Sequence, residues 1–145
     1  MSLFSTISVS ASGMSAQRTR AEILVQNLAN TETTHTAEGG PYKRKDVIFQ
    51  SQQVGSAYGS PFQTQLGGAL EGVVVSEITT DKTPPELRYA PGHPDANAEG
   101  YVAYPRMNAA EDMVDLMSAS RSYQANVAAI SAVKDMINKS LDLFR

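Results

Sequence analysis

The side chains best suited to chemistry lie in one short segment, PGHPDANAEG at residues 91–100. His93 precedes Asp95 by two residues, so the carboxylate could orient the imidazole as a general base. A base of this kind needs a nucleophile to activate, and no pattern in the sequence marks one. Proline and glycine flank His93, which favours a histidine in a solvated loop over a catalytic one.

The sequence gives equally little support for a metal site or a cofactor site. Neither His35 nor His93 has a second histidine at ligand spacing. Glu111, Asp112 and Asp115 form an acidic cluster, but they stand at the start of an expected helix, where capping and the helix dipole account for them. The absence of cysteine excludes disulfides, a thiolate nucleophile and cysteine-ligated metals. We therefore expect no catalytic residue, no cofactor, no metal site and no enzyme activity.

The basic run Lys43-Arg44-Lys45 invites a nucleic-acid interpretation. It stands in a segment, 31–105, with nine acidic and five basic residues, within a chain of net charge −3. Such a field attracts neither nucleic acid nor an anionic membrane surface. Basic residues that open a strand are typical of a solvated edge that blocks unwanted strand pairing. We therefore expect no nucleic-acid partner. No window approaches eighteen consecutive apolar residues, so we also expect no direct membrane insertion.

Proline and glycine divide the chain into three segments. All seven prolines and nine of the ten glycines lie between Gly39 and Pro105. The two ends are free of proline and can form long helices, whereas the middle is rich in turns. We expect a helix over 1–30, an inserted segment over 31–107 and a second helix over 108–145.

Both ends carry mainly apolar residues at spacings that alternate between three and four. This heptad pattern predicts helices that pack lengthwise on other helices, although the N-terminal pattern alone fits an ordinary amphipathic helix equally well. Its polar members Arg18, Ser120 and Lys134 either fix the register or are partly solvated. The N-terminal positions are Phe4, Ile7, Ala11, Met14, Arg18, Ala21, Val25 and Leu28, and the C-terminal positions are Met113, Leu116, Ser120, Tyr123, Val127, Ile130, Lys134, Ile137, Leu141 and Phe144.

The helix ends are marked by asparagines. Asn108, with Glu111 three residues later, predicts an N-cap, and Asn30 predicts a left-handed C-terminal cap. Residues 8–16, SVSASGMSA, contain four serines and a glycine, which weaken an isolated helix. We therefore expect the N-terminal helix to form only when it finds neighbours, and its small side chains allow a close approach.

The middle segment alternates short strands with turns. The expected strands are rich in β-branched and aromatic residues, and turn-rich loops at 55–68 and 90–100 separate them. The fold class is α+β, in which long N- and C-terminal helices pair as a coiled-coil-like bundle around a small inserted β-rich domain. The strands are expected at 42–52, 72–81, 86–90 and 100–105.

One long stretch, NLANTETTHTAEGGPYKRKDVIF at 27–49, resembles the N-terminal signature of bacterial flagellar basal-body rod proteins, in the form carried by proximal-rod members. Three further blocks match in order, and the resemblance fails only around 55–68. NLAN followed by GGPYKRKDV, with SASRSYQAN near the C-terminus, makes the match specific. The blocks are PGHPDANAEGYVAYP at 91–105, EDMVDLM at 111–117 and SASRSYQANV at 118–127.

The resemblance implies a structural subunit of the proximal rod, which assembles helically and transmits torque from the motor to the hook and filament. The terminal helices would form the inner, axial domain, with the β-rich part further out. Implied partners are further copies of the chain, rod proteins of the FlgB, FlgF and FlgG types, the FliE-type adaptor between rod and MS ring, and the flagellar type III export apparatus.

The implied location is the periplasmic rod of the basal body, reached without a cleaved signal peptide. The N-terminal residues MSLFSTISVSASGMS fit this expectation, because they contain no basic residue and no unbroken apolar block of the kind a secretory signal requires. The expected assembly interface consists of Phe4, Ile7, Met14, Arg18, Ala21, Val25, Leu28, Asn30, Met113, Leu116, Tyr123, Val127, Ile130, Ile137, Leu141 and Phe144.

Antiparallel pairing of the two helices would leave about 12 residues of the longer one unmatched, roughly 18 Å of helix. Three alternatives remain open: another axial rod or hook-family subunit, a soluble coiled-coil adaptor, and a small periplasmic cell-wall hydrolase that uses Asp95 and Glu99. The expected pairing places Leu28 near Leu116, Arg18 near Val127, and Phe4 near Leu141.

Overall fold

The computed structural model describes residues 3–53 and 71–143. The predicted loop at 55–68 and Phe144, the last position of the C-terminal heptad pattern, lie outside the described residues. The α+β class is confirmed, and each described strand lies on a predicted one. In chain order the elements are α1 Leu3–Ala29, β1 Lys45–Gln53, β2 Glu71–Thr80, β3 Glu86–Tyr89, β4 Tyr101–Tyr104 and α3 Ala109–Asp142.

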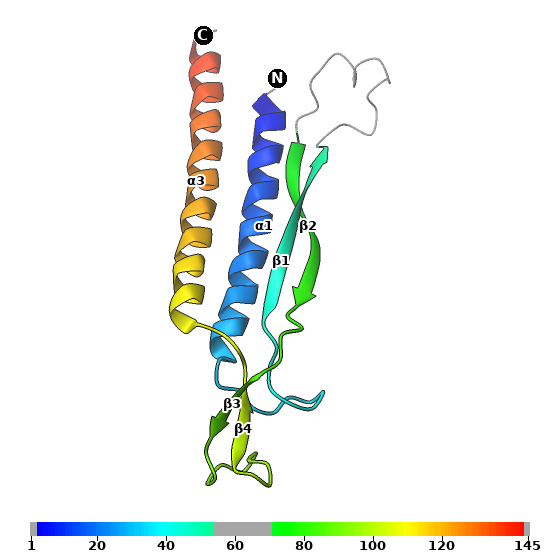
Figure 1. The fold of residues 1–145 in the computed structure, drawn as a ribbon. Helices are drawn as coiled ribbons and strands as arrows, with labels where there is room; N and C mark the ends of the chain where they lie inside the picture. Colours follow the sequence, from blue (N-terminus) through cyan, green and yellow to red (C-terminus); the bar gives the residue numbers. More distant parts are fainter. Residues whose placement is uncertain (1–2, 54–70, 144–145) are drawn as a thin grey trace.

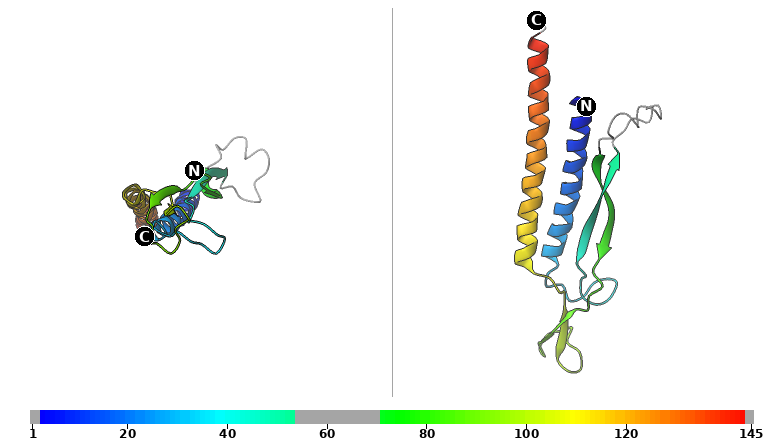
Figure 2. Two further views of the ribbon diagram at one scale, coloured as in Figure 1. Left: turned by 60° about the horizontal axis from the view of Figure 1, so that its bottom comes forward. Right: turned by 45° about the horizontal axis from the view of Figure 1, so that its top comes forward.

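The two helices lie side by side and antiparallel, with the start of α1 and the end of α3 at the same end of the molecule (Figure 1). The antiparallel hairpin β1–β2 runs along α1, which therefore lies between α3 and the hairpin. The second hairpin, β3–β4, projects beyond the opposite end of the helices (Figure 2). In its described residues, the β-rich segment thus comprises a ribbon that flanks α1 and a terminal hairpin.

The serine-rich stretch of α1 is explained by its neighbours. Ser10 is buried, and the hydroxyl of Ser12 accepts a hydrogen bond from the backbone N–H of Val73 at the edge of β2 (3.0 Å). An unpaired edge N–H of a two-stranded ribbon needs such a partner. Short side chains allow the strand to approach, as the sequence predicted for a helix that forms against neighbours.

Small side chains also set the distance between α1 and α3. A Cβ atom added to Gly13 would lie 3.1 Å from Nδ2 of Asn126, so the helices meet closely there. Ala16 and Ala119 are buried along the same contact. The expected pairing would have placed Gly13 opposite residue 132, about six residues further along α3. The predicted register was therefore wrong, because Gly13 has no side chain and lets the amide of Asn126 approach α1 at this point.

The helix ends differ in how well the sequence predicted them. Asn108 is the N-cap of α3, and its side chain accepts a hydrogen bond from the N–H of Ala110, as predicted. α1 ends at Ala29, but Asn30 does not adopt a left-handed conformation, since no described non-glycine residue has a positive φ. Instead the side-chain amide of Asn30 donates to the carbonyl of Gln26 (2.9 Å), which also accepts the backbone N–H of Asn30 (3.2 Å), so the helix ends without left-handed backbone.

The surplus length of α3 is smaller than expected. α1 has 27 residues and α3 has 34 described helical residues. At about 1.5 Å per residue the difference corresponds to about 10 Å of helix. Figure 1 shows the end of α3 extending past the start of α1.

Amide hydrogen exchange on the dilute monomer should reveal a gradient of local stability. Most of the buried side chains of the helix pair lie between Ala16 and Asn27 and between Asp112 and Ala119. We expect the slowest exchange in these segments and much faster exchange over residues 136–142, because local opening costs least where few side chains are buried. Uniform protection along α3 would contradict this expectation.

Candidate assembly interface and the junction that supports it

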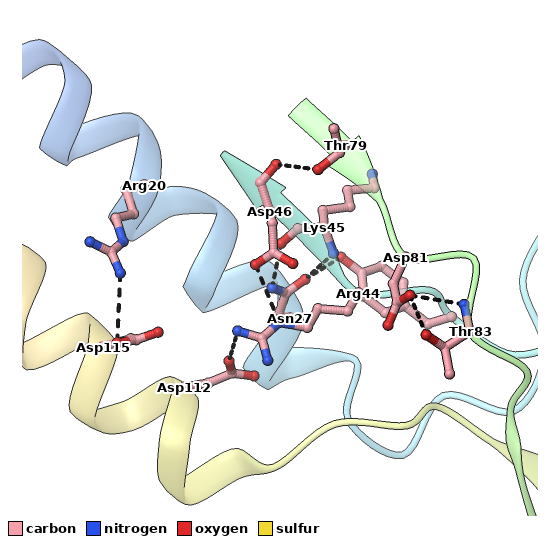
Figure 3. A network of polar contacts seen from close by, with 11 residues as sticks. Arg20, Asn27, Arg44, Lys45, Asp46, Thr79, Asp81, Thr83, Asp112 and Asp115 are labelled. Atoms are coloured by element: carbon pink, nitrogen blue, oxygen red, sulfur yellow. Dashed lines mark hydrogen bonds and ion pairs between the residues drawn. The ribbon is translucent and has the colours of Figure 1, made fainter. Parts of the chain in front are cut away.

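The side chain of Asn27 joins the end of α1 to the start of β1. It is fully buried, with an exposed fraction of 0%. Its Nδ2 donates to the Lys45 carbonyl (2.8 Å), and its Oδ1 accepts from the Lys45 N–H (3.0 Å) and from the Tyr42 hydroxyl (3.0 Å). Figure 3 shows the two bonds to Lys45. A buried amide is stable only when its polar atoms are paired, so Asn27 holds both elements in one arrangement.

Arg44 joins the same region to the first turn of α3. Its Nη2 lies 3.1 Å from Oδ1 of Asp112, whose side chain is fully buried, and its Nε lies 3.3 Å from Oδ1 of Asp46 (Figure 3). Neither oxygen of Asp112 has a partner with good hydrogen-bond geometry among the described residues, so charge rather than directional bonding holds the pair. Nearby, Arg20 of α1 lies 3.6 Å from Asp115 of α3. We call Asn27, Arg44 and Asp112 the junction.

The junction changes the interpretation of two sequence features. The run Lys43-Arg44-Lys45 was expected to be a solvated strand edge, but the Arg44 side chain is largely buried because it compensates a buried carboxylate. Asp112 was explained by capping and the helix dipole, and the structure shows that it is also the anionic partner across the junction. Both were missed because their partners are distant in sequence.

Burial raises the pKa of Asp112 above its usual range, and the Arg44 guanidinium opposes this shift. Asp115, Asp46 and Glu111 add to the increase through charge repulsion. Burial, with the charge of Asp112, also raises the pKa of Tyr42. The Tyr42 hydroxyl therefore stays protonated and remains a donor to Asn27.

On α3, only one of the two predicted heptad columns faces α1. Leu116, Ile130 and Ile137 are half-buried beside α1, with Tyr123 more exposed in the same column. The other contact column is displaced by one residue from the prediction. The structure uses Asp112, Ala119, Asn126 and Val133 in place of Met113, Ser120, Val127, Lys134 and Leu141.

The predicted column of α3, which includes Met113, Val127 and Leu141, points away from α1. Exposed fractions are 50% for Met113, 45% for Val127 and 62% for Leu141. The contact column has smaller side chains at the positions that face α1, and Asp112 reaches Arg44. Close helix approach and the ion pair therefore take precedence over the burial of larger apolar side chains.

On α1, the whole predicted pattern lies outside the main contact. Phe4, Ala11, Arg18 and Val25 are exposed, whereas Ile7, Met14, Ala21 and Leu28 are half-buried. Arg18 forms an exposed ion pair with Glu22 (2.9 Å), and Asn30 supports the turn after the helix. The interior of α1 is made by other residues, namely Ser10, Ala16, Ile23, Leu24 and Asn27.

The outward columns of the two helices lie on one side of the pair. In an antiparallel pair, columns rotated in the same sense from the contact emerge on the same side, and in both helices the half-buried column is followed by the exposed one. The ribbon covers the other side, where Ser12 meets Val73. We call this surface the apolar face; it comprises Phe4, Ile7, Met14, Val25, Leu28, Met113, Leu116, Tyr123, Val127, Ile130, Ile137 and Leu141.

The loop that contains His93 and Asp95 uses both side chains in hydrogen bonds that hold the backbone in place. Nδ1 of His93 accepts a hydrogen bond from the Asp95 N–H (3.2 Å), and the Asp95 carboxylate accepts one from the Thr34 hydroxyl (2.7 Å). The Asp95 carboxylate therefore ties the loop to the segment after α1. Among the described residues, no three histidine or acidic side chains are placed to hold a metal ion.

The cleft between α1, β1 and α3 has a volume of about 260 Å³. Arg20, Lys45, Asp46 and Asp115 line it, and the ion pair of Arg20 with Asp115 balances two of these charges. No helix in the described part of the chain has the length and apolar character needed to cross a membrane.

Replacement of Asn27 tests the junction. Asn27→Ala should lower the free energy of unfolding by about 1–3 kcal/mol, because it leaves the Lys45 backbone and the Tyr42 hydroxyl buried without a partner. Urea denaturation measures the change. Asn30→Ala is the matched control, with a smaller expected loss because its amide bond to Gln26 is exposed to water. Equal losses would contradict the role given to Asn27.

The buried carboxylate predicts a pH dependence. Because the folded state raises the pKa of Asp112, its contribution to stability is fully present below the ordinary aspartate pKa of about 3.9 and is lost as the pH rises through the folded value. Urea denaturation from pH 3.5 upward should therefore show the wild type losing stability relative to Asp112→Asn as the pH rises. Arg44→Gln should extend this loss to higher pH. A difference that is constant with pH would contradict the assignment.

The sequence was compared with known proteins. Residues 98–143 match the family described as the C-terminal part of flagellar basal body rod FlgEFG proteins. The flagellar basal-body rod protein FlgC of Bacillus subtilis is 44% identical over 150 residues, which cover 99% of both chains. FlgC of Borreliella burgdorferi is 39% identical, covering 100% of this chain and 99% of the relative, and that of Salmonella typhimurium is 38% identical, covering 99% and 98%. The chain therefore belongs to the FlgC family of flagellar basal-body rod proteins.

Proposed function

We propose that the chain is a structural subunit of the proximal rod of the flagellar basal body, and that neighbouring subunits pack on its apolar face. The observation that carries this proposal is the outward column of α3, where Met113, Val127 and Leu141 are each about half exposed or more. Large contiguous apolar surfaces on soluble proteins mark interaction sites. The similarity to FlgC proteins, which match this chain over nearly their whole length, supports the same assignment.

A shaft requires contacts that repeat without closing on themselves, so each subunit presents two different surfaces to its neighbours. The helix pair offers such surfaces: the apolar face on one side and the β1–β2 ribbon on the other. Burial of apolar area contributes about 25 cal/mol per Å², so a stripe along two helices can supply much of the association energy. Arg18 and Lys134 interrupt the stripe and favour one register over others.

Transmission of torque requires that the outer β elements and the helices move together. The junction provides this connection, because Asn27 fixes β1 to α1 and Arg44 fixes the same segment to α3. A twisting force on the β part would then reach both helices through buried bonds. The subunit would act as a rigid element of the shaft and carry out no chemical reaction.

The partners would be further copies, rod proteins of the FlgB, FlgF and FlgG types, and a FliE-type adaptor at the MS ring. Delivery to the periplasmic rod would use the flagellar type III export apparatus without a cleaved signal. The serine-rich N-terminal helix supports this route, because such a segment is weak in isolation and easily kept unfolded.

The variant Val127→Asp should prevent assembly while it leaves the fold of the subunit intact. Val127 is 45% exposed, so a charge there should change the free energy of unfolding by less than about 1 kcal/mol. The same charge, buried in an interface without a partner, should prevent assembly. Swimming of cells that carry only the variant, together with recovery of basal bodies, measures the effect.

Ser118→Asp is the matched control. Ser118 is exposed, and because it follows Met113 by five positions along the helix it lies outside the apolar face. Cells with this variant should swim. Normal motility with Val127→Asp would exclude the apolar face as an interface. Motility lost when Asp95 and Glu99 are both replaced by alanine, with loss of cell-wall cleavage, would instead support the hydrolase.

A further inference from the structure

The basic run Lys43-Arg44-Lys45 is divided between two places in the structure. Arg44 turns toward α3 and belongs to the junction, whereas the side chain of Lys45 turns away from α3 (Figure 3). Lys43 and Lys45 both line a separate cavity of about 410 Å³ beside the segment that follows α1. Residues two apart in an extended chain point to the same side, which brings both lysines to this cavity. We call it the lysine pocket, and its walls also include Thr36, Glu38, Gly39, Tyr42 and Thr80.

The two lysines carry charge that their surroundings do not neutralise. Neither ammonium group forms an ion pair with a residue that the structure describes. The Lys45 Nζ lies 6.0 Å from the centre of the Tyr42 ring. Among the described residues that line the pocket, Glu38 is the only acid. The pocket is therefore locally positive in a chain of net charge −3, and such a local field attracts an anion.

One wall of the lysine pocket has a fixed shape. The N–H of Thr36 donates to the carbonyl of Gly40 (2.9 Å), and the N–H of Gly39 donates to the carbonyl of Thr36 (2.9 Å). The Thr36 hydroxyl also donates to the Gly40 carbonyl (3.2 Å). Gly39 has a φ of +87° and Gly40 a φ of +79°, a conformation that glycine adopts without steric cost. The loop therefore holds this wall in place before any ligand arrives.

The side chains that line the pocket favour a phosphate group over other anions. A planar carboxylate is bound best by the fork of an arginine, and the arginine of this run is already used in the junction. Lysine ammonium groups act as point charges and suit a tetrahedral phosphate. A phosphate monoester carries a charge of about −1.5 to −2 near pH 7, which two lysines can balance. A nucleic-acid strand would bring many more phosphates against a chain that is negative overall.

We propose that the lysine pocket binds a single phosphate group, which the ammonium groups of Lys43 and Lys45 hold with the Thr80 hydroxyl as a neutral donor. The volume of the pocket lies in the range of small-ligand sites, about 300–1,000 Å³. The phosphate belongs either to a small soluble molecule or to a lipid headgroup. This site goes beyond the structural role and is separate from the apolar face.

Titration of the purified full chain with inorganic phosphate tests the site. Backbone amide chemical shifts are recorded at constant ionic strength, which is kept with chloride. We expect saturable shifts confined to residues 36–45 and to Thr80, because these residues surround the pocket. The absence of saturable shifts there would overturn the proposal.

Substitutions that remove one charge each identify the groups that bind. Lys43→Gln and Lys45→Gln should each weaken phosphate binding by about fivefold, the effect of losing one partly exposed ion pair. Glu38→Gln should strengthen binding, because it removes a repelling charge from the pocket wall. Lys82→Gln is the matched control, because Lys82 is exposed and is not among the residues that line the pocket. Unchanged amide shifts in α3 show that each variant keeps its fold.

Equal weakening by Lys82→Gln would reduce the binding to general attraction of anions and overturn the site. So would unchanged affinity in the double variant Lys43→Gln/Lys45→Gln. Flotation with phosphatidylglycerol vesicles distinguishes the two sources of phosphate. Vesicle binding that the double variant loses would assign a lipid headgroup, whereas phosphate binding without vesicle binding would assign a soluble ligand.

Discussion

The buried amide of Asn27 is the constraint on which the arrangement of the chain depends. Its three hydrogen bonds all go to residues 42 and 45, so the strand that follows can start at only one place relative to α1. Because β1 begins there, the ribbon runs along α1, and Val73 reaches Ser12 in the N-terminal half of the helix. Arg44 stands between the two bonded residues and is thereby aimed at Asp112, which fixes the start of α3. One side chain thus determines where three elements meet.

The contact between the helices follows from a competition between closeness and apolar burial. Gly13, Ala16 and Ala119 allow the backbones to approach, and the buried pair of Arg44 with Asp112 fixes the rotation of α3. Together they turn the bulky side chains of Met113 and Val127 outward. A buried ion pair adds little net stability compared with apolar packing, but it favours one arrangement over others. The subunit therefore keeps a defined shape while leaving apolar surface free.

The elements themselves could be predicted from local sequence. Proline-free ends, the Asn108 cap and the β-branched segments identified both helices and all four strands that the structure describes. The antiparallel pairing of the helices was predicted as well, but the rotation of each helix about its own axis was not, because a heptad pattern shows that a stripe is apolar and does not show whether its partner lies in the same chain. Asn27 and Arg44 were missed for a related reason. A polar residue inside an apolar helical run is a signal of a buried hydrogen bond, but its partners at 42 and 45 lie beyond a turn that periodicity does not describe.

The junction also sets an order of events for a chain that emerges from its N-terminus. The bonds of Asn27 to Lys45 span 18 positions and form early, whereas the contact of Arg44 with Asp112 spans 68 and that of Gly13 with Asn126 spans 113. Closing the longer loops costs more entropy and must wait for the last part of the chain. α1 and the ribbon can therefore meet while the α3 side of α1 is still bare. The fold is complete only when α3 packs on α1, because its contacts with Arg44 and Gly13 close these long loops.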